Sequence, residues 1–105
     1  MELKTAFGAT LKQVRLARNL VQEDFALVSS RTNISLLERS KTIPTLEKME
    51  ELCALMNLHP VTLLAACYMK KEGNGDVTNF LTVIKRELEA LMIEFDQSQA
   101  RAGEE

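Results

Sequence analysis

Apolar residues recur at spacings of three and four along almost the whole chain, which is the periodicity of one face of an α-helix. Gly and Pro together number only six among the 105 residues, too few for the tight turns of an all-β fold. We therefore expect an all-α protein. The longest apolar series spans about five helical turns and occupies positions 77, 80, 81, 84, 88, 91, 92 and 95.

Residues that start and stop helices divide the chain into five short helices followed by the long one. Asn19 and Asn57 stand where a left-handed residue closes a helix, while Thr45 and Asp76 are suited to N-caps. The polar segment 70–76 holds two of the four glycines and reads as a linker. The predicted organisation is an N-terminal domain over 1–69, a linker over 70–76, a helix over 77–99 and a frayed tail over 100–105.

The composition excludes several classes of protein. No stretch of 18 apolar residues exists, and Met1 is not followed by the pattern of a secretory signal, so we expect a cytoplasmic protein without membrane contact. Cys53, Cys67 and the single histidine, His59, are too few ligands for a zinc site. The sequence shows neither a nucleophile–His–acid set nor a Gly-rich phosphate loop. We predict no metal, no cofactor, no catalytic residue and no enzyme activity.

A set of short motifs lies in order along residues 11–64. Its members are Leu11, Arg15, Gln22-Glu23-Asp24-Phe25-Ala26, Ile34-Ser35-Leu36-Leu37-Glu38-Arg39, Pro44-Thr45-Leu46 and Leu55-Met56-Asn57-Leu58. This ordered set resembles the helix-turn-helix domain of the XRE family, which includes the lambdoid phage repressors and Cro proteins. That resemblance implies a five-helix lambda-repressor-like domain and a bacterial or phage transcriptional repressor that binds double-stranded DNA at a palindromic operator as a homodimer.

The helix that Ser29 or Ser30 would cap carries small polar or basic residues, as a helix that enters the major groove needs. Arg31 can pair with guanine or hold a phosphate, Asn33 can pair with adenine, and the methyl group of Thr32 can touch thymine. For an arbitrary helix such a polar run is more often a solvated face. With the resemblance, the expected DNA-binding residues are Gln22, Ser30, Arg31, Thr32, Asn33, Ser35, Arg39, Lys41 and Thr42.

Other roles follow from the resemblance alone. Gln22 matches a family glutamine that bonds the DNA backbone and can brace a base-reading residue. Arg15 and Glu38 match a structural ion pair that fixes the recognition helix. Arg39 could hold a phosphate or serve as an exposed salt-bridge partner.

The sequence departs from the family pattern at two places. The stretch from Ala26 to Ser35 is about two residues shorter than usual and contains no glycine, so the turn must be tighter or the preceding helix must end early. Ser40 stands where many relatives have glycine, and we expect it to cap the helix or to adopt a less demanding turn.

The long C-terminal helix is amphipathic and must bury its apolar stripe. It could fold back on its own domain, pair with a second copy, or receive a different protein, as in an antitoxin-like or adaptor module. We favour pairing between two copies because of the length of the stripe and the glycines before it. The expected dimerisation residues are Phe80, Leu81, Ile84, Leu88, Leu91, Met92 and Phe95.

The formal net charge of −2 conceals an asymmetry between the two parts of the chain. Residues 1–71 hold ten Lys or Arg and seven Asp or Glu, a balance of +3. Residues 72–105 hold three and eight, a balance of −5. We therefore expect a moderately basic DNA reader joined to an acidic helix.

Overall fold

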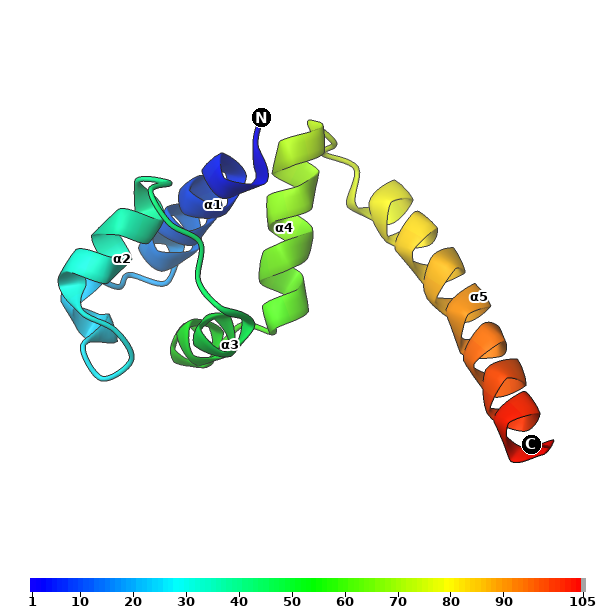
Figure 1. The fold of residues 1–105 in the computed structure, drawn as a ribbon. Coiled ribbons are helices and arrows are strands. Elements are labelled where there is room, and N and C mark those ends of the chain that lie inside the picture. The colour runs from blue at the N-terminus through cyan, green and yellow to red at the C-terminus, as the bar shows by residue number, and fades with distance from the viewer. Residues whose placement is uncertain (105) are drawn as a thin grey trace. The chain divides into compact units, whose positions relative to one another are not determined.

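The computed structural model describes residues 1–104, with side chains through Arg101, and all regular secondary structure in that range is helical. The all-α fold with a long C-terminal helix is therefore confirmed. The chain divides after Gly73 into two compact units. The first contains α1 (Leu3–Ala17), the 3-10 helix η1 (Gln22–Phe25), α2 (Arg31–Glu38), α3 (Leu46–Leu55) and α4 (Pro60–Glu72), and the second contains α5 (Val77–Glu104) (Figure 1).

One continuous core holds the first unit together. Helix α1 packs against α2 and α4, α3 packs against α4, and η1 packs against α2. Each element contributes apolar side chains at helical spacing, so the core is closed by residues distant in sequence. Its buried members are Phe7, Leu11, Phe25, Ile34, Leu37, Met49, Leu52, Cys53, Met56, Leu63 and Cys67.

Three short helices end on a residue in the left-handed conformation. Asn19 and Asn57, with φ of 58° and 55°, confirm the predicted helix ends. Ser40 has φ of 62°, so the expectation of a less demanding turn at this position is wrong. After it, the backbone N–H of Lys41 donates to the carbonyl of Leu36, which closes the helix end in the Schellman pattern.

Gly8 explains how α1 approaches this end of α2. A Cβ at Gly8 would lie 2.5 Å from the Ser40 hydroxyl oxygen and 2.7 Å from the Leu37 carbonyl oxygen. Only glycine leaves room for that approach. The backbone at Ser40 and the missing side chain at Gly8 thus fix the C-terminal end of α2 against α1.

The second predicted helix is only the single turn η1, so of the two outcomes expected from the short Ala26–Ser35 stretch, the early end of this helix is the one observed. Ser30 has the extended conformation of an N-cap, so the chain must leave the helix before it. The N–H groups of Val28 and Ser29 instead both donate to the Phe25 carbonyl. Of the apolar face expected here, Phe25 is buried but Ala26 is exposed.

Some boundaries and faces also differ from expectation. Helix α4 continues to Glu72 and closes on Gly73 in the left-handed conformation, so the link to α5 is residues 73–76 rather than 70–76. Leu46 and Val61, predicted to face inward, are 72% and 61% exposed because each lies in a first helical turn at the edge of the core.

Helix α5 is N-capped by Asp76, whose carboxylate accepts the N–H of Asn79 at 3.0 Å, as predicted. The helix continues to Glu104, beyond the predicted end at residue 99, since Gln, Ala, Arg and Glu are good helix formers. The frayed tail predicted for 100–105 is therefore helical as far as Glu104, and residue 105 lies outside the described range.

Candidate DNA-binding surface

Helix α2 is short, anchored on one face and polar on the other. The Ser30 hydroxyl accepts the N–H of Asn33 at 3.1 Å and starts the helix. Ile34 and Leu37 are buried in the core, which leaves Arg31 and Thr32 exposed on the opposite face. Eight residues make a helix of about 12 Å, a length that fits a major groove of similar width.

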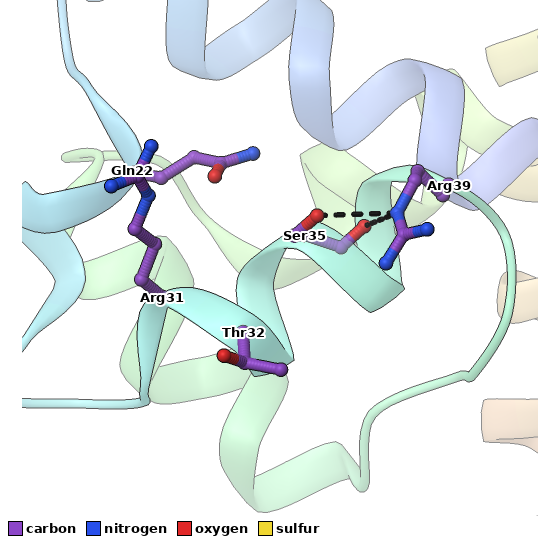
Figure 2. A pocket seen from close by; sticks show the side chains of 5 residues that line it. All are labelled: Gln22, Arg31, Thr32, Ser35 and Arg39. Carbon is purple, nitrogen blue, oxygen red and sulfur yellow. Dashed lines mark hydrogen bonds between the residues drawn. The ribbon is translucent and has the colours of Figure 1, made fainter.

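The exposed face of α2 and the start of η1 enclose a shallow polar hollow of about 290 Å³ (Figure 2). Figure 2 shows Arg31 extending from the first turn of α2 toward Gln22, while Arg39 lies at the far end of the helix beside Ser35. Two guanidinium groups and an amide therefore line one surface. The lining residues are Gln22, Arg31, Thr32, Ser35 and Arg39, all five predicted to bind DNA.

The two arginines have different partners. Nη1 of Arg31 lies 2.9 Å from Oε1 of Glu23, and both side chains are exposed. Nε of Arg39 donates to the Ser35 hydroxyl at 3.2 Å and approaches its carbonyl oxygen at 3.4 Å. Within residues 1–101, Arg39 has no acidic partner, so its remaining guanidinium N–H groups face solvent.

A buried ion pair locks α2 to α1. Nε and Nη2 of Arg15 donate to the two carboxylate oxygens of Glu38 at 2.6 and 2.9 Å, in the fork geometry that arginine favours. The side chains are 9% and 4% exposed. Nη1 of Arg15 donates to the Leu20 carbonyl at 2.9 Å. The hydrogen bond to Glu38 raises the pKa of Arg15, against the opposing effect of burial, so the guanidinium group stays charged.

Gln22 joins this pair to the exposed surface. Its Nε2 donates to Oε1 of Glu38 at 3.3 Å, and the side chain also lines the hollow. The glutamine is therefore held by the locked carboxylate while it borders the polar surface. This arrangement suits a residue that braces others as well as one that touches DNA.

Two predicted DNA-binding residues are already engaged within the protein. Ser30 caps α2 with its hydroxyl, and Nδ2 of Asn33 donates to the Ser29 hydroxyl at 2.5 Å. That bond uses one of the two N–H groups of Nδ2, so an adenine contact by Asn33 would have to use the second N–H and Oδ1 in the orientation that the bond imposes. Lys41 and Thr42 are exposed in the segment after α2, outside the hollow.

The residues set aside by sequence reasoning have structural roles. His59 caps α4, with Nδ1 accepting the N–H of Val61 at 3.0 Å. Cys53 and Cys67 are free and fully buried, and burial raises the pKa of both thiols. Among the residues that the structure describes, no three His, Cys, Asp or Glu residues gather as a metal site would require.

Over the same described range, no single helix is long and apolar enough to cross a membrane. Helices α3 and α4 reach the required length and apolarity only as a pair, and the pair is bent by 104°.

A short helix with a buried anchor face and an exposed basic face, packed across a second short helical turn, defines a helix-turn-helix DNA-binding protein. Comparison with protein families agrees, since a helix-turn-helix family model matches residues 11–63, just over half of the chain. The protein belongs to the XRE family of helix-turn-helix proteins, so it is a DNA-binding transcriptional regulator. No curated protein matched the sequence.

Proposed function

We propose that this regulator is a repressor that binds a palindromic operator as a homodimer, with α2 in the major groove of each half-site. The observation that carries the proposal is the hollow over α2, because it presents two guanidinium groups on a helix whose orientation a buried ion pair fixes. Two copies related by a two-fold axis would read half-sites about one helical turn apart. A dimer on such a site excludes other proteins from it, which is sufficient for repression.

Arg31 and Thr32 are the best candidates for base contacts. Both lie in the first turn of α2, are exposed and border the hollow. The guanidinium of Arg31 matches the two acceptors of guanine, and the Thr32 methyl group suits thymine. Because Asn33 is bonded to Ser29, we assign it mainly to holding the first turn of α2.

Phosphate contacts fall to residues at the C-terminal end of α2 and just beyond it. Arg39 has N–H groups facing solvent, while Lys41 and Thr42 are exposed just beyond α2. Ser35 orients Arg39 through its hydroxyl. Such contacts supply affinity and register, and they make binding sensitive to salt.

Helix α5 would join the two copies. Six residues of its stripe are between 37% and 55% exposed: Leu81, Ile84, Leu88, Leu91, Met92 and Phe95. Phe80, the seventh predicted dimerisation residue, is only 9% exposed, so the surface offered to a second copy consists of the other six. Within residues 74–104 α5 is the only element, so the unit offers nothing to cover the stripe. Since burial of each such side chain contributes about 1.5–3 kcal/mol, pairing with a second copy is favourable.

The test begins with selection of bound duplexes from a random DNA pool by the full chain. Arg31→Ala should weaken binding to the selected duplex by about 10- to 100-fold, the cost of one guanine contact. Arg86→Ala, which removes an exposed arginine on α5, is the matched control and should leave affinity unchanged. If Arg31→Ala binds as tightly as wild type, α2 does not read this DNA through Arg31. A protein that selects no sequence would contradict the proposed function altogether.

A further inference from the structure

Lys48 connects α3 to the segment that leads into α2. Its Nζ donates to the Val28 carbonyl at 2.5 Å and lies 2.9 Å from the Glu51 carboxylate. The side chain is one-third exposed, so the ammonium group is partly withdrawn from water. Val28 stands two residues before Ser30, the N-cap of α2. Lys48, which does not line the hollow over α2, thus binds the backbone just before the start of that helix.

The turn that Lys48 holds has few other attachments. Between Phe25, the end of η1, and Ser30 there is no glycine, and Leu27 in its middle is entirely exposed. Only Val28 packs partly against the core. The backbone N–H of Ala26 donates to the Glu23 carbonyl and those of Val28 and Ser29 donate to the Phe25 carbonyl, while the Ser29 hydroxyl accepts from Asn33 of α2, so none of these bonds reaches α3. The Lys48 bond is therefore the attachment that fixes this segment to α3.

Lys48 is also an unfavourable residue for its position at the start of α3 when only local helix preferences are considered. It is the third residue of the helix after the N-cap Thr45, where glutamate or glutamine completes a capping box. A positive charge in the first turn interacts unfavourably with the helix dipole, whereas the negative charge of the neighbouring Glu47 interacts favourably with it. Such a local conflict is expected where a side chain serves a purpose elsewhere in the fold.

We propose that Lys48 is a positioning residue for DNA reading: through the Val28 carbonyl it sets the start of α2, and hence the placement of Arg31 and Thr32, without touching DNA. The inference rests on the proposed function of α2. The inference adds a residue of α3 to those that determine DNA recognition. It also explains how the shortened turn between Phe25 and Ser30, which lacks glycine, keeps a defined position.

A direct phosphate contact by Lys48 predicts a different result from positioning. Loss of a phosphate contact weakens binding to all sequences and lowers the slope of log affinity against log salt by about one. Loss of positioning weakens binding to the selected duplex, leaves a scrambled duplex unaffected and keeps the slope. The ratio of the two affinities therefore separates the two roles.

The experiment uses the full chain, a duplex that wild type selects from a random pool, and a duplex of the same length with the base order scrambled. Lys48→Met keeps the apolar stem and removes the ammonium group. We expect it to lose about tenfold in affinity for the selected duplex and less than about twofold for the scrambled one. Lys48→Arg, which keeps a charged donor, should recover most of the loss. Glu51→Gln, which removes the other partner of Lys48, should bind like wild type.

Equal losses on both duplexes with a lowered salt slope would overturn the proposal, and so would a Lys48→Met variant that binds like wild type. Hydrogen exchange is the second measurement. Faster exchange at residues 28–33 of Lys48→Met, with unchanged exchange in α4, supports positioning, whereas a uniform increase contradicts it. If Lys48→Met does not fold, Lys48→Gln takes its place in both assays. Failure of wild type to select any duplex would instead overturn the proposed function.

Discussion

The two units of this chain bury their apolar residues in opposite ways. In the first unit, Leu52 and ten neighbours are enclosed by helices distant in sequence, and even the Arg15–Glu38 pair is withdrawn from water. In the second, the stripe on α5 has no companion element within its own unit. The first unit thus encloses its own apolar core, whereas the second leaves most of its apolar stripe exposed.

The largest expected effects lie in the first unit. Leu52→Ala should lower the free energy of unfolding by about 2–5 kcal/mol because Leu52 is fully buried. Arg15→Met should cost about 3–5 kcal/mol, since it leaves the Glu38 carboxylate buried without its partner. Urea denaturation measures both. Leu88→Ala on α5 is the comparison variant and should lower the free energy of unfolding less. An equal loss of stability in this variant would contradict the difference in burial between the two units.

A smaller effect should appear in self-association through α5. Leu88→Asp places a charge in the stripe and should shift the chain from dimer toward monomer, as sedimentation at micromolar concentration would detect. Ile93→Asp is the matched control, because Ile93 is similarly exposed but lies nine residues, two and a half turns, from Ile84 and so on the opposite face. If both variants dissociate alike, the stripe is not the contact surface. A wild-type chain that captures a different protein and never pairs with itself would favour the antitoxin-like alternative.

The smallest expected effect is a pH dependence that belongs to the first unit. Burial raises the pKa of Cys53 and Cys67, so the folded state holds their protons more tightly than the unfolded chain does. Stability contributed by the neutral thiols is present below their ordinary pKa and declines as pH rises above about 8. Urea midpoints at neutral and alkaline pH should show this decline, and a Cys53→Ala, Cys67→Ala double variant should show less of it. A steeper decline in the double variant would assign the effect to other groups.

Local signals were sufficient to predict most of the fold. Thr45 and Asp76 mark helix starts through their own side chains, and Asn19 and Asn57 mark helix ends through their tolerance of the left-handed conformation. These interactions span three or four residues, so the sequence shows them directly. The stripe of α5 is equally local, since one helix carries all of it.

What the sequence could not show depends on contacts between distant elements. The sequence left open whether the turn is tighter or the second helix ends early, and the position of Phe25 in the core accompanies the early end at η1. Nothing in the sequence marks Ser29 as the partner of Asn33, or Val28, twenty residues away, as the partner of Lys48. For the candidate site, the sequence therefore indicated which residue types are present but not which residues they hydrogen-bond.

Sedimentation of protein–DNA complexes would test most directly whether the two units have separate roles. The full chain and a fragment of residues 1–73 would each be mixed with the selected duplex. We predict that the full chain binds as two copies per duplex, whereas the fragment stays folded, remains monomeric in solution and binds the same duplex more weakly. A fragment that dimerises and binds as tightly as the full chain would contradict the assignment of pairing to α5.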